Sequence, residues 1–132
     1  RTPPTIVPED VATDLENRIH AADEHIFVDE ALQEIALDLA NGIKSGLSDH
    51  KLRGILNGGM GRLKGYVTVL SSVTPTVNLA AVDPIKLVNF PKIDHVGIAV
   101  IQGHHPTLGD NVITIVVVMA RRPSLRASPK GL

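Results

Sequence analysis

The sequence predicts an α+β fold in which helices cover a three-stranded antiparallel sheet. Three observations support this prediction. Residues 9–57 carry apolar side chains at helical spacing, residues 64–73 form a strand-like run, and residues 95–119 hold two β-rich runs around a turn. Because the long helices precede an antiparallel hairpin and do not alternate with parallel strands, the order indicates α+β and not α/β.

The centre of the predicted sheet is this long hairpin. Residues 95–101 alternate, with Val or Ile at the even positions and His95, Gly97 and Ala99 among the odd ones. Residues 102–111 are rich in turn formers, and residues 112–119 are almost continuously apolar, as in a strand covered on both faces. If its edge were uncovered, this second strand could pair with a strand of a partner.

Two helices are predicted in the first third of the chain. The first spans about residues 9–23, with Pro8 before it and acidic side chains in its first turn. Asp29 is the predicted N-cap of the second helix, and Gly46 is its predicted C-terminal glycine. Its broad apolar face makes this second helix the strongest helical pattern of the chain.

The middle of the chain alternates between helix and strand signals. A third helix is predicted over residues 49–57, ending at the glycines 58–59. The strand over residues 64–73 is expected to break at the Thr-Pro-Thr of residues 74–76. A short helix should follow over residues 84–90, so the order is three helices, strand, short helix and two strands.

The domain organisation predicted from these patterns is simple. Residues 9–122 form one domain, residues 1–8 an extended lead-in with three prolines, and residues 123–132 a flexible tail or inter-domain linker. The start at Arg1 suggests a processed or trimmed end, either the linker left after removal of a signal peptide or, equally well, a boundary chosen for expression. We therefore expect a piece of a larger secreted or surface protein.

Composition excludes several classes of function. The 13 basic and 14 acidic residues give a net charge of −1, which argues against a nucleic-acid binder, and three aromatic residues are too few for base stacking. The absence of cysteine excludes disulfides, thiolate catalysis and cysteine-based zinc sites. No apolar run reaches the roughly 20 residues of a membrane span.

Short motifs of the chain resemble a known family. Asp-His-Val-Gly-Ile-Ala-Val at residues 94–100, followed by the apolar run 112–119, is similar to the paired central strands of the CAP superfamily (cysteine-rich secretory, antigen and pathogenesis-related proteins) in its short bacterial form. Leu32, Ala36 and Ala40 resemble the Leu-xxx-Ala-xxx-Ala helix of that family. The element order agrees over residues 9–122, and the resemblance implies an α-β-α sandwich in a secreted or cell-surface bacterial protein.

The chain departs from the site that this family carries. Two histidines and two acids surround the family's cleft, but residues 41–46 hold no helix histidine and residues 66–72 no acid. Residues 88–91 stand where a Ser-Pro-Gly-His segment is expected, so only His95 can be carried over. The resemblance therefore implies a non-catalytic binding or assembly module with a protein or cell-surface ligand, and a homo-oligomer is a further expectation.

His95 is the first candidate site residue, and two interpretations are open. It shares a strand face with Gly97 and Ala99, so it could stand beside a shallow floor as a ligand or base. Alternatively, these small residues admit a closely packed helix, and His95 is simply hydrogen-bonded at the start of its strand.

The hairpin-loop histidines are the second candidate. His104 and His105, with Asp110 nearby, offer imidazole and carboxylate ligands suited to a divalent metal such as zinc or nickel. Combined with His95, they would make a histidine-dependent metal site or hydrolase, which is the alternative to the binding module. The simpler interpretation is a solvated turn; no cofactor is predicted otherwise, and His20 and His25 could join a cluster only through tertiary folding.

Overall fold

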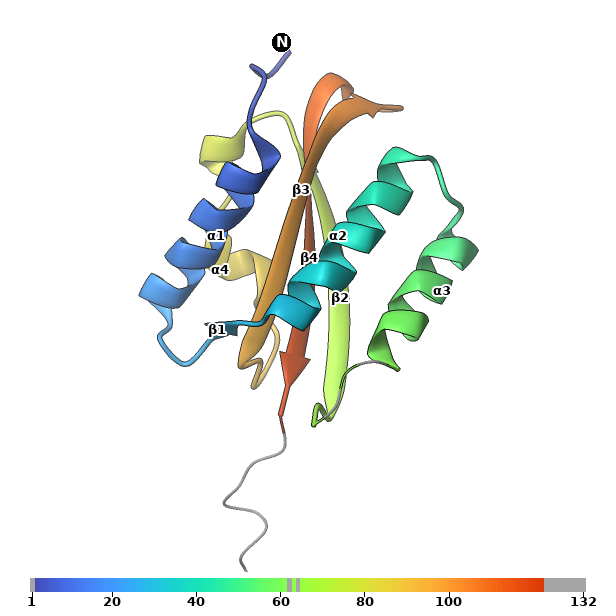
Figure 1. Ribbon diagram of the computed structural model, residues 1–132. Helices are drawn as coiled ribbons and strands as arrows, with labels where there is room; N and C mark the ends of the chain where they lie inside the picture. The colour runs from blue at the N-terminus through green and yellow to red at the C-terminus, as the bar shows by residue number, and fades with distance from the viewer. Residues whose placement is uncertain (1, 62, 64, 123–132) are drawn as a thin grey trace, which may run out of the picture.

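The computed structural model describes residues 2–61, 63 and 65–122. Its centre is a four-stranded mixed sheet in the order β1-β3-β4-β2 (Figure 1). The strands are β1 (Phe27–Val28), β2 (Thr68–Thr76), β3 (His95–His105) and β4 (Gly109–Arg121).

The α+β class is confirmed, but the prediction of three antiparallel strands is wrong. Phe27 and Val28 pair in parallel with His95 and Val96 and add a fourth strand at the edge. A strand of two residues leaves no periodicity in the sequence, because its existence depends on a tertiary partner. The other pairings, β3 with β4 and β4 with β2, are antiparallel.

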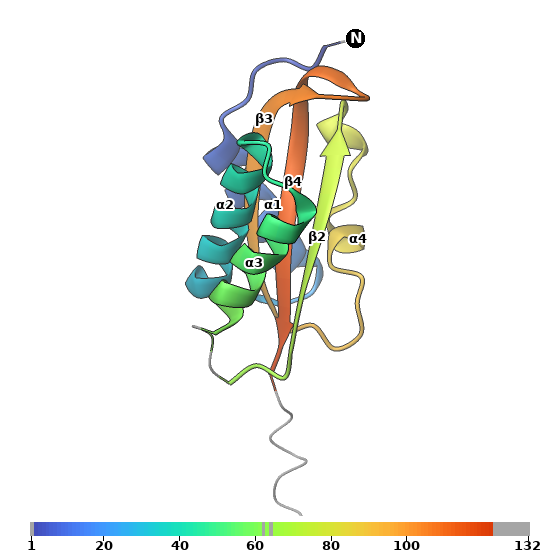
Figure 2. The same ribbon diagram turned by 90° about the vertical axis from the view of Figure 1, so that its right-hand side faces the viewer.

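Helices lie on both faces of the sheet. They are α1 (Pro8–Ala22), α2 (Glu30–Lys44), α3 (Asp49–Met60), the 3-10 turn η1 (Leu79–Ala81) and α4 (Pro84–Leu87). Helices α1 and α4 cover one face, while α2 and α3 cover the other; Figure 2 shows α3 and α4 on opposite sides of the sheet.

Two hydrophobic cores result from this arrangement. Val96, Ile98 and Val100 pack with α1 and α4, whereas Ala99 packs with α2. The predicted alternation of residues 95–101 is thus confirmed, and so is the burial of the second strand on both faces, since its residues alternate between the two cores. However, β4 lies between β3 and β2 with both edges paired, so it cannot accept a partner strand; β2 is the outer strand.

A side-chain cap fixes where α2 begins. The Asp29 carboxylate accepts the N–H groups of Ala31 and Leu32 at the start of α2, as its predicted role as N-cap requires. Gly46, just beyond α2, has a φ of 79°, the left-handed conformation that glycine adopts without strain. The boundaries of α2 therefore match the prediction.

Several predicted boundaries are wrong. Helix α4 ends at Leu87 and not at residue 90, β2 begins at Thr68, and β3 and β4 extend into the predicted loop 102–111. Helix α3 continues through Gly58 and Gly59 to Met60, because Gly59 packs against Ile35 and a Cβ there would lie 2.6 Å from Ile35 Cγ1. Strand β2 includes Pro75, although the sequence predicts that this proline ends it. Proline is tolerated there because β2 is the outer strand, where a missing N–H group costs least.

The lead-in before α1 is fastened to the hairpin. The Gln102 side chain accepts the N–H of Ile6 at 2.9 Å and donates to the carbonyl of Pro4 at 2.8 Å. Asn111 Nδ2 donates to the carbonyl of Pro3 at 3.3 Å. The predicted tail, residues 123–132, lies outside the described residues. Within the described part of the chain, no helix is long and apolar enough to cross a membrane.

Candidate functional site

His95 lies in a row of aromatic rings at one end of the sheet. Its imidazole is 6.0 Å from the Phe27 ring and 5.5 Å from the Tyr66 ring, measured between centroids. His20 continues the row, 5.4 Å from Phe27. We call His20, Phe27, His95 and Tyr66 the aromatic row. It gathers two of the three aromatic residues of the chain with two of its six histidines.

Four separate segments build the aromatic row. The parallel pairing of β1 with β3 sets Phe27 beside His95. His20 sits near the end of α1, and its Nδ1 is 2.8 Å from the carbonyl oxygen of Ile26. Tyr66 comes from the segment before β2, which is held by the Val67 N–H donating to the Arg121 carbonyl at 2.8 Å. The row therefore depends on the tertiary fold and not on any local motif.

Two aspartates hold the row in place through hydrogen bonds. His95 Nδ1 lies 2.7 Å from Asp94 Oδ1, and both Asp94 oxygens accept the main-chain N–H of Arg122 at 3.2 Å. The Tyr66 hydroxyl donates to Asp29 Oδ2, while Asp29 Oδ1 caps α2. Because their carboxylate oxygens already take part in these hydrogen bonds, Asp29 and Asp94 position the rings of the aromatic row.

The Tyr66–Asp29 contact shifts the pKa of both groups. Burial alone would raise the pKa of Asp29, but the hydrogen bond from Tyr66 and those from the N–H groups of Ala31 and Leu32 outweigh it, so the pKa lies below its usual value. Burial raises the pKa of Tyr66, and its bond to Asp29 raises it further. The pair is thus stable with a neutral phenol and an ionised carboxylate.

The surface around the aromatic row also carries the cation of Arg122 and the exposed ring of Phe27. The Arg122 guanidinium carbon lies 5.2 Å from the centre of the Tyr66 ring, within the range of a cation–π contact. Phe27 is 52% exposed, whereas the His95 side chain is only 17% exposed. Tyrosine and arginine are enriched in the hot spots of protein interfaces, and phenylalanine is enriched in interfaces generally.

The small residues beside His95 are covered by a helix. A Cβ on Gly97 would lie 2.2 Å from the Gln33 nitrogen and 2.3 Å from the Leu32 carbonyl carbon, so the α2 main chain occupies the space over Gly97. The shallow floor proposed for His95 is therefore absent. The alternative interpretation is confirmed: a closely packed helix lies over Gly97, and His95 is hydrogen-bonded at the start of its strand.

The loop histidines lie far from His95. His95 begins β3 and His104 lies near its end, nine residues on, which is about 30 Å at roughly 3.4 Å per residue. His104 Nδ1 pairs with Asp110 Oδ1 at 2.8 Å on an exposed surface. His105 Nδ1 accepts the N–H groups of Thr107 and Leu108, each at 3.1 Å, so His105 closes the turn.

The structure does not assemble the three candidate histidines into one metal site. Across residues 2–61, 63 and 65–122, no group of three or more histidine, aspartate or glutamate side chains could hold a metal ion. His95 and Asp94 form one pair, and His104 and Asp110 form another, at opposite ends of β3.

Sequence reasoning misses most of the aromatic row. No motif singles out Phe27, Tyr66 or Arg122, and the sequence predicts only a helix cap at Asp29. One compositional signal could have helped: the chain has three aromatic residues, so each of them was a candidate binding residue. No sequence pattern, however, predicts that Tyr66 and Phe27 flank the same imidazole.

The fold and the site together define an α+β domain with a mixed four-stranded sheet and a cluster of aromatic and imidazole rings at one end. In comparisons with known proteins, no family model, no curated protein and no solved structure matches this chain.

Proposed function

We propose that this domain is a non-catalytic, extracytoplasmic CAP-like module that binds a protein ligand through the aromatic row. In this proposal it works as one part of a larger secreted or surface protein. The observation that carries the proposal is the exposed Phe27 ring beside His95, with Tyr66 and Arg122 on the same surface.

The fold supports the CAP-like part of the proposal. The motif that resembles the family, residues 94–100, forms the start of a central strand with His95 as its first residue. Helices lie on both faces of the sheet, as in the family's α-β-α sandwich. The second helix with Leu32 and Ala36 packs directly on that strand, with both residues fully buried.

The chemistry of the row supports binding over catalysis. Asp29 and Asp94 accept hydrogen bonds from Tyr66, Arg122 and the α2 main chain, so they are engaged in holding the rings. A hydrolase or metal site built from His95 with the loop histidines would need these groups together, and β3 separates them by about 30 Å. We therefore favour the binding module over this alternative.

A peptide selection tests the proposal. The immobilised domain is used to select binders from a phage-displayed library of random peptides, and each enriched peptide is then measured against variants. Phe27→Ala should weaken the enriched peptides by about 2 kcal/mol, roughly thirtyfold, as for a hot-spot aromatic residue. His95→Ala should weaken them too, because it removes the ring that supports Phe27.

Phe90→Ala is the matched control, since Phe90 is also an exposed phenylalanine, at 44%, and does not belong to the row. Peptides that lose affinity for Phe27→Ala but keep it for Phe90→Ala support the proposal. A library that yields no specific binder, or binders that Phe27→Ala leaves unaffected, would contradict it.

A further inference from the structure

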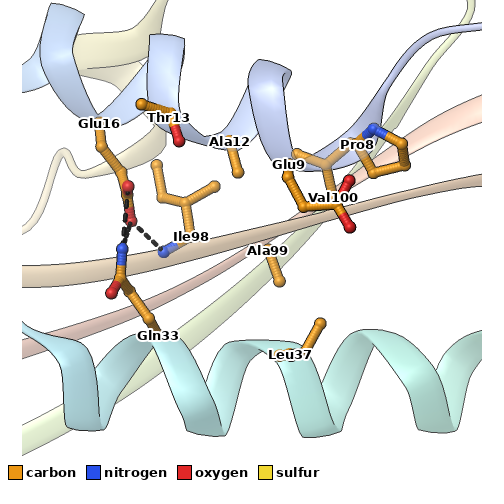
Figure 3. Close-up of a pocket in the computed structure, with 10 residues that line it drawn as sticks. All are labelled: Pro8, Glu9, Ala12, Thr13, Glu16, Gln33, Leu37, Ile98, Ala99 and Val100. Atoms are coloured by element: carbon orange, nitrogen blue, oxygen red, sulfur yellow. Dashed lines mark hydrogen bonds between the residues drawn. The ribbon is translucent and has the colours of Figure 1, made fainter.

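A pocket of about 200 Å³ opens between α1 and α2, away from the aromatic row. Its floor is β3 at Ile98, Ala99 and Val100, and its walls are the two helices (Figure 3). The side chains of Glu16 on α1 and Gln33 on α2 meet and close one end of it. Its volume is below the roughly 300 Å³ of the smallest drug-sized sites, so it suits a smaller molecule.

The pocket exists because strand β1 is short and because small side chains line the space between the helices. Strand β1 pairs only with residues 95–96, so beyond Val96 the edge of β3 has no strand beside it. Alanines at positions 12 and 99 leave space between the helices. On this edge the Val96 carbonyl accepts the main-chain N–H of Asp29. Because main-chain groups alternate along a strand, the N–H and C=O of Ile98 also point out from this edge.

Glu16 places a carboxylate inside this hollow. Its side chain is on the inner face of α1 and the residue is only 5% exposed. Gln33 Nε2 donates to both carboxylate oxygens, at 2.8 and 3.0 Å, and the Ile98 N–H donates to one of them at 3.2 Å. All three donor contacts come from neutral amides.

The charge of Glu16 has no cationic partner in the part of the chain that the structure describes. Burial raises the pKa of its carboxyl, although the bonds from Gln33 and Ile98 act in the opposite direction. A buried ion is costly unless an opposite charge compensates it. Glu9 lies at the other end of the pocket, so the charged side chains of the lining are both acidic.

We propose that the pocket between α1 and α2 binds a small organic cation, an ammonium or guanidinium group, with Glu16 as its counter-ion. The cation approaches the carboxylate from the pocket, opposite Gln33, while its alkyl part lies over Ala12 and Ala99. Glu9 adds a second negative charge at the open end. This site is separate from the aromatic row, so it stands or fails independently of the proposed function.

Titration with n-butylammonium, followed by ¹H–¹⁵N NMR of the whole chain, tests the proposal. The Ile98 amide and the Gln33 side-chain amide, both bonded to Glu16, should shift and saturate in the millimolar range. The neutral isostere n-butanol should bind at least tenfold more weakly, because hydrogen bonds between charged groups exceed neutral ones. Equal binding of butanol would overturn the proposal.

Variants locate the site and guard against misfolding. Glu16→Gln should weaken butylammonium at least about tenfold. Thr13→Leu, at an exposed position on the pocket wall, should weaken it by narrowing the entrance while leaving the core intact. Asp10→Asn removes the same charge from α1 outside the pocket lining and should leave binding unchanged. A similar loss in Asp10→Asn and Glu16→Gln would show a nonspecific charge effect and overturn the proposal.

Two further probes identify the source of the cation. Nα-acetyl-lysine methylamide presents the same ammonium group on a peptide unit. Binding as tight as that of butylammonium assigns the pocket to a lysine side chain of a protein. Binding of butylammonium alone assigns it to a free small amine, and saturation by neither probe overturns the proposal.

Discussion

Gly97 on β3 touches the main chain of Gln33 on α2 so closely that no side chain fits between them. A Cβ on residue 97 would fall 2.2 Å from the Gln33 nitrogen and 2.7 Å from its Cα. This contact fixes the height of α2 above the sheet. It also brings the Gln33 amide within reach of Glu16 on the neighbouring helix, so one glycine positions both the second helix and the wall of the pocket.

Gly97→Ala should therefore destabilise the domain by about 3 kcal/mol or more, because α2 has to lift away from β3 and its packing is lost. Urea denaturation followed by circular dichroism measures the change. Gly103→Ala is the matched control: it lies on the same strand, and a Cβ on Gly103 would meet nothing within 4 Å. Near-equal midpoints for the two variants would contradict the close-contact interpretation.

Tyr66→Phe should raise the pKa of Asp29, since it removes the hydroxyl that stabilises the ionised carboxylate. The native pKa is depressed, so Asp29 contributes stability that is present above its unfolded pKa of about 4 and lost as the pH falls through its folded pKa. The variant should lose less stability on acidification than the native chain. Carboxyl ¹³C NMR gives the titration, and denaturation at several pH values gives the stability.

The same substitution probes the phenol side of the contact. The pKa of Tyr66 is raised, so the neutral phenol contributes stability below its unfolded pKa of about 10 that is lost as the pH rises through the folded value. The Tyr66→Phe variant has no phenol to ionise, so its stability should not fall as the pH rises through this range. If Tyr66→Phe left both the Asp29 titration and the fall of stability at alkaline pH unchanged, the contact between the Tyr66 hydroxyl and Asp29 would have no energetic role.

The sequence contains enough local information to predict the long elements. The alternation of residues 95–101 and the Asp29 cap each reflect interactions within a few residues, and both predictions match the structure. The wrong predictions involve tertiary packing. Phe27 joins the sheet only because β3 lies beside it, and Gly59 stays helical only because Ile35 packs against it.

The candidate site shows the same division. His95 could be found from its strand position, and His105 from its turn-rich surroundings. Their separation along β3 depends on how far the strands extend into the predicted loop: β3 continues to His105 and β4 begins at Gly109. The aromatic row depends on one contact between α1 and β1 and on two long-range contacts, from β1 and from the segment before β2 to β3, none of which leaves a periodic pattern.

Glu16 predicts an unusual dependence of stability on pH. Its folded-state pKa is raised, so the folded domain holds the proton more tightly than the unfolded chain, and stability falls as the pH rises from the unfolded value of about 4.3 through the folded value. Glu16→Gln should remove this fall while keeping an acceptor for the Ile98 N–H. Denaturation midpoints of the native chain and of Glu16→Gln, compared across mildly acidic pH, measure the fall of stability and its expected absence in the variant.

Glu16→Ala is the informative comparison for this prediction. It leaves the Gln33 amide and the Ile98 N–H without their acceptor, so it should cost about 1–3 kcal/mol at neutral pH. Asp10→Asn removes an exposed acid from the first turn of the same helix and should cost only about 0.3–1 kcal/mol, the contribution of a favourable charge at a helix N-terminus. Equal effects of Glu16→Ala and Asp10→Asn would contradict the role of Glu16 as a buried bridge between α1, α2 and β3.

A zinc titration followed by NMR of the histidine rings distinguishes the histidines at the two ends of β3. His104 forms an exposed pair with Asp110, so its ring should shift with zinc, whereas His95 should not shift with it. His104→Ala should abolish the loop response, and His95→Ala should leave that response unchanged.

Since about 30 Å separates the two rings within one chain, a joint shift at one equivalent of zinc would require the loop of one copy to meet His95 of another. Light scattering of the zinc-loaded protein would then report an oligomer, and a monomer showing the joint shift would contradict the extended β3 strand itself.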